Sequence, residues 1–441
     1  MMKVFQIVLM AFLLLNLSPP VGAAAPDLSR QLIGHGGPVN SIAISPDGKQ
    51  ALSGSLDYAV ILWDLDSSTP KHTKRFTEHR GAVSEVRFLS SGTEAISSGD
   101  DGTIYLWDVE NRALLHRFKG HKAKVVSLDF TADDRILASA SWDGTVRLWD
   151  LNARKALKEI KVHKQTVHTV LLSTDGNTVY SGGYDGKIRR YDSDTGQFIK
   201  ILHNHGWPIN IMRWHPDKKQ IIFGTTNGDV QILDVSSSRI SKILIPHEKP
   251  VLGLTVSPKH GLIATGGNDG VIRVWDIKDW SVIGETAGIP GPVWALAFTN
   301  DGKSLYFGSL DDQVKFWKIS NTDEIQWDKN FKQRRFQVTE GLPLGELQFA
   351  RKCSVCHSLS PTNKNRAGPS LYKVLGRKAG SLAEYPYSDS LVDSNLVWDE
   401  QTIDRLFAQG PNAVIPGSKM PLQKIPDEKK RSALIDYLKN L

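Results

Sequence analysis

The only two cysteines of the 441-residue chain are three positions apart, in the segment RKCSVCHSLSP at 351–361, and a histidine follows the second. Two thiols and an imidazole this close together could form a disulfide, act as a thioredoxin-like dithiol, bind zinc or attach a haem. Zinc is disfavoured because Cys353, Cys356 and His357 leave a tetrahedral site one ligand short, with no ligand cluster nearby. The dithiol is disfavoured because no strand–helix–strand pattern surrounds the pair. The residues around the segment must therefore distinguish a disulfide from a haem-attachment site.

Before this segment, from residue 28 to about 320, the chain repeats one unit seven times. After a first interval of 44 residues, a Trp-Asp pair or its variant recurs every 42 residues, at Trp63-Asp64, Trp107-Asp108, Trp149-Asp150, Tyr191-Asp192, Leu233-Asp234, Trp275-Asp276 and Trp317-Lys318. Two further series keep the same period. One consists of His35, His79, His121, His163, His205 and His247, with Ile289 in the seventh place. The other consists of Asp57, Asp101, Asp143, Asp185, Asn227, Asp269 and Asp311.

The turns between the repeated apolar runs predict short antiparallel strands. Asp-Gly or Asn-Gly occurs in five copies, beginning with Asp101-Gly102, and is a strong signal for a two-residue hairpin. With its three series in phase, the segment resembles the WD40 repeat family. The resemblance implies a seven-bladed all-β propeller over 28–319, in which residues 28–33 complete the last sheet. It also implies that His, Ser or Thr, Asp and Trp brace each blade, with an incomplete network in the seventh copy.

Departures from the period indicate where the propeller could act. The place before the turn Asp holds Trp142 and Tyr184 in two of the copies, and Trp207 and Lys249 stand among small residues two positions after the His place. His168 and Trp294 stand out in the inner strands. In propellers of this kind such positions face one end of the central channel. A basic-aromatic patch there suits a protein partner. Ordinary turn and strand packing is the alternative interpretation.

After Ile319 the period ends, and the polar residues 320–340 are interpreted as a linker. In the last hundred residues the apolar side chains fall at helical spacing. This part, 341–441, resembles the class I cytochromes c, including the mitochondrial and bacterial high-potential type. The resemblance rests on Gly345, Phe349, CSVCH at 353–357, AGPSL at 367–371, LGRKAG at 375–380, Tyr387, Trp398, PGSKM at 416–420 and LIDYLK at 434–439. It implies a small all-α domain.

The resemblance implies one haem c, attached by thioethers from Cys353 and Cys356, three apart at the start of a helix. His357 is then the proximal iron ligand. The sixth ligand follows by elimination. Met420 is the only methionine after Met212, and His357 is the only histidine after His260. A thioether ligand favours Fe(II) and raises the reduction potential.

The resemblance also implies supporting roles around the haem. The Pro369 carbonyl should accept the N–H of His357, and Ser418 should border Met420. Arg377, Tyr387 and Trp398 should bond or shield a propionate. Leu391 and Leu406 replace polar residues that relatives carry near the methionine. Lysines near the haem motifs suit an acidic redox partner, namely Lys352, Lys364, Lys373, Lys378 and Lys419.

The N-terminal residues 1–24 are expected to be a secretory signal, because Lys3 precedes an apolar run, Val4 to Leu17, and the small residues VGAAAP follow. A retained anchor is the competing interpretation, but the run is short for a membrane span. The mature protein is thus expected to be soluble and periplasmic, with no membrane span. The net charge is +7, yet the basic residues are scattered and no nucleic-acid motif is present.

Together these observations predict a protein of at least two domains that transfers single electrons through a His/Met-ligated haem, while the propeller binds a redox partner or a further subunit. An electron carrier with six-coordinate iron is not expected to be an enzyme. Two alternatives stay open. The propeller could be catalytic and receive electrons from the cytochrome domain, or the chain could be a redox-sensing scaffold.

Overall fold

The computed structural model describes residues 28–67, 69–319, 341–354, 356–361, 368–383, 385, 387, 389–415, 420 and 423–441. The expected signal at 1–24, the linker at 320–340 and Ser418 lie outside the described residues. Among the residues described, no helix combines the length and the apolar character that crossing a bilayer requires.

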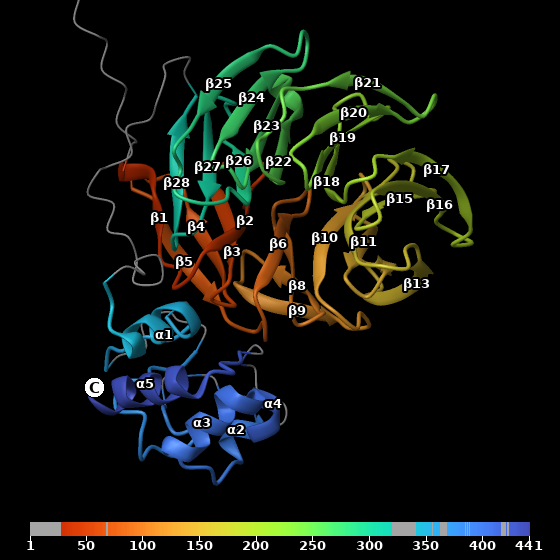
Figure 1. The fold of residues 1–441 in the computed structure, drawn as a ribbon. Coiled ribbons are helices and arrows are strands. Elements are labelled where there is room, and N and C mark those ends of the chain that lie inside the picture. Colours follow the sequence, from red (N-terminus) through yellow and green to blue (C-terminus); the bar gives the residue numbers. More distant parts are fainter. Residues whose placement is uncertain are drawn as a thin grey trace, which may run out of the picture.

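The strands form seven separate four-stranded antiparallel sheets, arranged around a central channel as the blades of a propeller (Figure 1). In each of the first three blades the strands run from the channel to the rim in chain order. Blade 1 consists of β2 (Val39–Ile44), β3 (Gln50–Ser55), β4 (Val60–Asp64) and β5 (Lys71–Phe76). Blade 2 consists of β6 (Val83–Phe88), β7 (Glu94–Gly99), β8 (Ile104–Asp108) and β9 (Ala113–Phe118). Blade 3 consists of β10 (Val125–Phe130), β11 (Ile136–Ser141), β12 (Thr145–Asp150) and β13 (Lys155–Lys161).

The next three blades repeat this order. Blade 4 consists of β14 (Val167–Leu172), β15 (Thr178–Gly183), β16 (Lys187–Asp192) and β17 (Phe198–Asn204). Blade 5 consists of β18 (Ile209–Trp214), β19 (Gln220–Thr225), β20 (Val230–Asp234) and β21 (Arg239–Ile243). Blade 6 consists of β22 (Val251–Ser257), β23 (Leu262–Gly267), β24 (Ile272–Asp276) and β25 (Val282–Thr286).

The seventh blade is built from both ends of the repeat region. It consists of β26 (Ala295–Phe298), β27 (Ser304–Gly308), β28 (Gln313–Lys318) and β1 (Leu32–Ile33). Strand β1 pairs antiparallel with β28, with Leu32 opposite Val314. The predicted closure of the ring by the N-terminal strand is therefore confirmed. Short 3₁₀ turns at Leu28–Arg30 and Pro258–His260 flank strands β1 and β23.

A buried hydrogen-bond chain braces the blades, as predicted. In blade 1, Trp63 Nε1 donates to Ser53 Oγ at 2.7 Å, and that oxygen is 2.7 Å from His35 Nε2. His35 Nδ1 is 3.0 Å from Asp57 Oδ2. Burial alone would raise the pKa of Asp57, but His35 and Arg75 together hold it far below its usual range. The chain Trp–Ser–His–Asp thus keeps every buried polar group paired.

Other blades repeat this chain or replace parts of it. His79, His121, His163 and His247 each contact the Asp of their own copy and a Ser or Thr of the second strand. In blade 5, His205 pairs with Asp229 instead, at 3.0 Å, because the usual place holds Asn227. Blade 7 has no histidine, and buried Lys315 pairs with Asp311. The network of this blade is therefore incomplete, as predicted: the ion pair with Lys315 replaces the missing His–Asp contact, and Asp311 Oδ1 is buried without a hydrogen-bond partner among the described residues.

The C-terminal residues form helices below blades 1 and 2 in Figure 1. They are α1 (Leu344–Lys352), α2 (Asp389–Val392), α3 (Glu400–Gln409), α4 (Pro411–Val414) and α5 (Glu428–Lys439). Helix α1 crosses α5 closely at Gly345, where a Cβ would lie 2.1 Å from the Ala433 carbonyl oxygen. Phe349 and Tyr437 pack beside this crossing, with ring centroids 5.8 Å apart.

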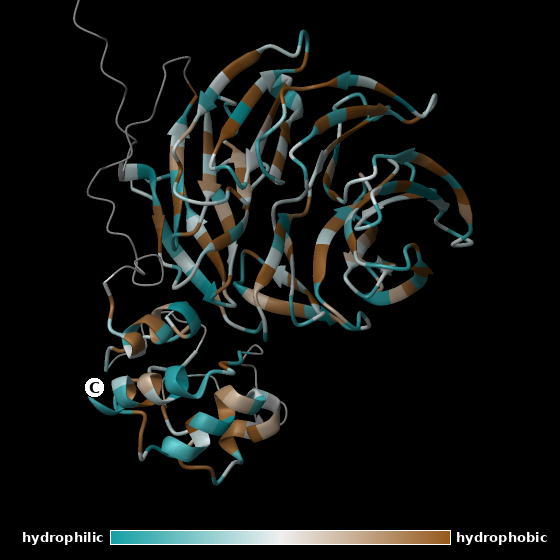
Figure 2. Cartoon of the chain, viewed as in Figure 1, coloured by the Kyte–Doolittle hydropathy of each residue, from teal (hydrophilic) through white to brown (hydrophobic). Residues whose placement is uncertain are grey.

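The hydrophobic core is divided in the same way as the chain. Each pair of neighbouring blades buries its own apolar cluster, and a separate cluster around Phe349, Phe407 and Leu434 holds the C-terminal helices together. Hydrophobic and hydrophilic residues alternate in bands along the strands in Figure 2. The C-terminal region therefore has its own core beside the propeller.

Candidate functional site

The Cys pair follows the end of helix α1. Cys353 caps this helix, donating its N–H to the Phe349 carbonyl at 2.9 Å, and the N–H of His357 donates to the Cys353 carbonyl at 2.8 Å. The pair was expected to begin a helix, and this expectation is wrong. The segment instead turns back on itself as soon as α1 ends, which brings both sulfur atoms and the imidazole to one pocket.

The two thiols do not form a disulfide. Burial raises the pKa of Cys353 to about 12, and the neighbouring Cys356 adds to this shift. A reactive dithiol needs a lowered pKa, so the environment of Cys353 does not suit thiol–disulfide exchange. No cluster of three or more His, Cys, Asp or Glu residues suited to a metal ion occurs among the residues that the structure describes. The environment of the Cys pair therefore does not suit a redox dithiol.

His357 is held in one orientation by its backbone neighbours. Its Nδ1 is 2.7 Å from the carbonyl oxygen of Pro369, which can only accept, so Nδ1 carries the proton. Gly368 lies flat against the ring, where a Cβ would be 2.3 Å from Cε1. The proton on Nδ1 leaves Nε2 with the lone pair. This is the tautomer in which an imidazole can bind a metal through Nε2.

One apolar pocket brings most of the predicted site residues together. Its lining includes Cys353, Cys356, His357, Pro369, Arg377, Tyr387, Trp398 and Met420. Leu391 and Leu406 also line it, so the apolar replacements noted in the sequence are part of the site. His357 offers an imidazole and Met420 a soft thioether, both of which haem iron accepts as ligands, and two thiols are the groups that attach a haem covalently. This donor set and the apolar lining fit a c-type haem.

Arg377 is anchored at the rim of this pocket by the backbone. Its guanidinium donates to the carbonyl oxygens of Ser370, at 2.5 Å, and Tyr372, at 3.2 Å. Burial lowers the pKa of Arg377, while Tyr387 opposes that shift. The backbone of Trp398 pairs with that of Arg377 and Gly376, and both Trp398 and Arg377 line the pocket. A cation placed this way is suited to an acidic group at the pocket edge.

Two tyrosines in this pocket were missed from the sequence. Tyr385 packs edge-on against Tyr387, with ring centroids 4.7 Å apart. Tyr58 comes from the propeller, in the turn between β3 and β4, and lines the same pocket. Burial raises the pKa of both phenols, with Cys356 contributing to each shift. The C-terminal pocket is thus closed in part by a residue of blade 1.

The special role of Tyr58 could have been inferred from the residue that follows the turn Asp or Asn in each repeat. In five copies the turn Asp or Asn is followed by Gly, and Gly102 and Gly144 adopt left-handed φ angles of 71° and 84°. Tyr58 occupies this place in blade 1 with φ of 68°. A side chain costs about 1 kcal/mol in that conformation. A bulky residue that accepts such strain in only one copy indicates a role other than turn formation.

Comparisons with known proteins agree with this division of the chain. The profile of the family described as "WD domain, G-beta repeat" matches residues 27–64, 69–108, 112–150, 154–192, 238–276 and 282–318. The matches pass over the copy around Leu233, which lacks the Trp, although this segment forms blade 5.

The C-terminal part is similar to small cytochromes. It is 38% identical over 98 residues to cytochrome c2 of Rhodomicrobium vannielii, covering 22% of this chain and 78% of that protein. It is 46% identical over 91 residues to cytochrome c2 iso-2 of Magnetospirillum molischianum, covering 20% and 90%. It is 33% identical over 94 residues to cytochrome c of Kluyveromyces lactis, covering 21% and 84%.

Proposed function

We propose that this chain is an exported monohaem cytochrome whose propeller serves as a docking platform. The chain belongs to the WD-repeat family and, in its C-terminal part, to the cytochrome c family. Residues 1–24 are the signal, 28–319 the propeller, 320–340 the linker and 341–441 a small all-α class I cytochrome c domain. After cleavage the protein is soluble in the periplasm. It transfers single electrons between partner proteins.

The observation that carries this proposal is the pocket that gathers two thiols, an oriented imidazole and a thioether. A single haem c bound there supplies the reversible one-electron Fe(III)/Fe(II) couple. Cys353 and Cys356 would attach it, and His357 and Met420 would bind its iron. The Pro369 carbonyl holds the proton on Nδ1 of His357. With these two residues bound to the iron, no position would be left for a substrate, so the group would serve to carry electrons.

The remaining pocket residues set the surroundings of this group. Arg377, Tyr387 and Trp398 bond or shield a propionate, and Ser418 borders Met420. Leu391 and Leu406 exclude water and withhold hydrogen bonds from the methionine side, so the reduction potential differs from that of relatives with polar residues there. Tyr58 of the propeller covers part of the pocket, which links the two regions of the chain at the site of electron transfer.

The partner surfaces follow from exposed residues. On the cytochrome domain, Lys352, Lys373 and Lys378 are exposed and suit an acidic redox partner. On the propeller, Trp142, Tyr184 and Trp207 are 45%, 55% and 56% exposed. The turns that carry Trp142 and Tyr184 are equivalent to the turn of Tyr58, so this aromatic patch lies at the same end of the propeller as the haem pocket.

The aromatic patch has the composition of a protein-binding surface. Lys124 Nζ lies 3.4 Å from the ring centroid of Trp142, a close cation–π contact. His168 packs near both Trp142 and Tyr184, with ring centroids 6.2 and 6.3 Å away. Exposed aromatic residues near a cation are common anchors in interfaces. A protein or subunit bound to this patch would be held beside the electron-transfer site.

The assignment of Met420 is tested by Met420→Ala in the purified exported protein. The oxidised variant should lose the long-wavelength sulfur-to-iron band and show a lower reduction potential, because a thioether ligand stabilises Fe(II). Met212→Leu, a buried methionine of the propeller, is the control and should keep both. An unchanged spectrum in Met420→Ala would refute the ligand.

The same preparation separates the carrier from the alternative functions. Metal and pigment analysis should give one haem c per chain and no second cofactor. A further metal or chromophore would favour a catalytic propeller fed by the cytochrome domain. Failure to pass electrons to any acidic redox protein, combined with a partner that binds in only one oxidation state, would favour a redox-sensing scaffold.

A further inference from the structure

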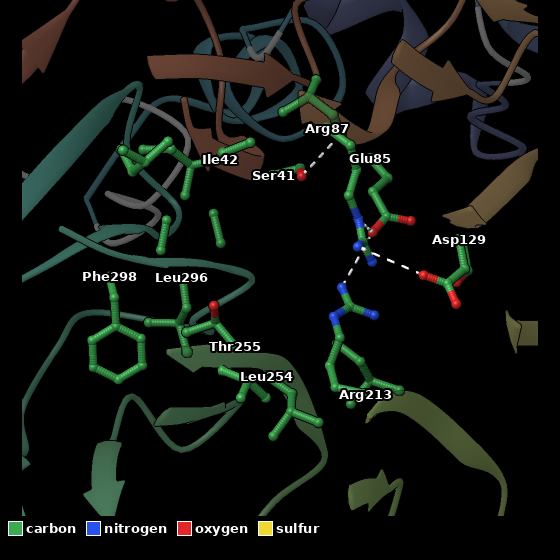
Figure 3. Close-up of a pocket in the computed structure, with 18 of the residues that line it drawn as sticks. Ser41, Ile42, Glu85, Arg87, Asp129, Arg213, Leu254, Thr255, Leu296 and Phe298 are labelled. Atoms are coloured by element: carbon green, nitrogen blue, oxygen red, sulfur yellow. Dashed lines mark hydrogen bonds and ion pairs between the residues drawn. The ribbon is translucent and has the colours of Figure 1, made fainter. Parts of the chain in front are cut away.

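The central channel of the propeller contains a second cavity, of about 550 Å³, lined by the innermost strands (Figure 3). Side chains from six of these strands are labelled in that view, including Glu85 and Arg87 of β6, Asp129 of β10 and Arg213 of β18. None of these four belongs to the repeated series that braces the blades. The cavity is therefore built from positions in which the blades differ from one another.

One side of the cavity carries a network of charged groups. Arg87 Nε donates to Glu85 Oε1 at 3.0 Å, and Arg213 Nη2 reaches the same oxygen from across the channel at 3.2 Å. Arg87 Nη1 is 3.9 Å from Asp129 Oδ1. In Figure 3 Arg87 extends beside Glu85 from the same strand, and Arg213 extends toward both from another inner strand. Two cations are thus held close together inside the propeller.

The carboxylates of this network are already occupied. Glu85 Oε2 accepts the backbone N–H of Leu128 at 2.5 Å, and Asp129 Oδ2 accepts that of Leu172 at 2.9 Å. Arg87 Nη2, in contrast, is buried and has no hydrogen-bond partner among the residues that the structure describes. Buried donors in folded proteins are nearly always paired. An acceptor supplied from outside the chain would complete this network.

The charge of the lining favours an anion. The charged side chains that line the cavity are the cations Arg87, Arg213, Lys218 and Lys259 and the acids Glu85 and Asp129. Burial, together with the nearby Arg87, lowers the pKa of Arg213 to about 10. An anion would relieve the repulsion between the two guanidinium groups. The two acidic side chains would repel a highly charged ligand, which disfavours polyphosphates.

The opposite side of the cavity is apolar. Ile42, Leu254, Leu296 and Phe298 face the space across from the charged network in Figure 3. A guanidinium fork matches the two oxygens of a carboxylate, and an apolar wall matches a hydrocarbon or aromatic body. We propose that the channel binds a small organic carboxylate with an apolar body, whose carboxylate is held by Arg87 and Arg213.

The test uses the full-length holoprotein with benzoate as the probe and calorimetry as the readout. Benzoate should bind saturably, while benzamide, which has the same shape without the charge, should bind at least tenfold more weakly because it cannot form charge-assisted hydrogen bonds. Inorganic phosphate should not bind more tightly than benzoate. Absence of saturable benzoate binding, equal binding of benzamide, or preferred binding of phosphate would each overturn the proposal.

Variants locate the site. Arg87→Gln should weaken benzoate binding on the order of tenfold or more. Arg239→Gln, an exposed arginine on the outer strand β21, is the matched control and should bind as the unmodified protein does. If Arg87→Gln lowers stability but leaves benzoate affinity unchanged, the network only joins the blades and the proposal fails. Should that variant not fold, Lys259→Gln, at another cation of the cavity lining, gives the same comparison with a smaller expected loss.

Discussion

The histidines of the propeller and His357 of the C-terminal region differ in what their two ring nitrogens contact. In blade 1, His35 uses both nitrogens within the fold, one against Asp57 and the other against Ser53. His357 places Nδ1 against a backbone carbonyl and keeps Nε2 as the nitrogen with the lone pair, in a pocket that also contains sulfur donors. The same residue type therefore serves as a brace in one region and as a candidate ligand in the other.

The two regions also differ in the contacts made by residues that depart from the expected sequence pattern. In the propeller, an altered position is compensated locally, as when Lys315 pairs with Asp311 where a histidine is missing. In the pocket, the unusual residue Tyr58 comes from the other region and gains contacts there. Breaking a brace should therefore change stability, whereas changing a pocket residue should change the haem signal or its access to solvent.

The largest effect on stability is expected for His35→Ala. Loss of the imidazole leaves the buried Ser53 hydroxyl without its partner Nε2 and removes one donor from the buried Asp57, which should lower the free energy of unfolding by about 3 kcal/mol. His72→Ala, an exposed histidine on β5, is the control and should change it by less than about 0.5 kcal/mol. Denaturant unfolding followed by tryptophan fluorescence measures both. Equal effects of the two substitutions would argue against the bracing role.

A pH effect of intermediate size is expected from His163. Burial, with Arg189 nearby, lowers its pKa from 6.5 to about 4. Between these values the unfolded chain binds a proton that the folded propeller does not, so stability should fall as the pH falls from about 6.5 to about 4. At about 1.4 kcal/mol per pKa unit, the loss is on the order of 3 kcal/mol at most.

The contribution of His163 is isolated by subtraction. Other histidines and carboxylates titrate in the same range, so the stability of the unmodified protein is compared with that of His163→Gln at each pH. The difference between the two proteins should shrink toward pH 4. A difference that is constant with pH would show that His163 does not supply this dependence.

The smallest effect is expected for Tyr58→Gly, which tests the contact between the two regions. Glycine removes the strain of φ at 68°, so the propeller should gain up to about 1 kcal/mol of stability. Loss of the ring should also open the haem pocket and speed reduction by a small soluble reductant. Tyr184→Gly, exposed on the same end of the propeller, is the control for a change of surface alone. If both variants are reduced at the same rate as the unmodified protein, Tyr58 does not cover the pocket.

Much of this architecture could be predicted because it depends on residues that are close together in the sequence or that recur at a fixed period. The repeated His, Asp and Trp positions define the blades, and the short spacing of Cys353, Cys356 and His357 predicts that they share one site. Tyr58 and the channel network could not be assigned in the same way. Arg213 and Glu85 are 128 residues apart and meet only when the ring closes. Which inner-strand side chains share the channel depends on that closure and not on any local pattern.

The central claim is that haem is attached covalently to Cys353 and Cys356, and it is tested most directly by denaturing electrophoresis with peroxidase staining. The full-length protein, produced in a host that attaches haem c, should give a stained band that persists after reduction. The double variant Cys353→Ala and Cys356→Ala should lose the stain, while Arg351→Gln, an exposed neighbour, should keep it. An unmodified protein that remains unstained would contradict the account.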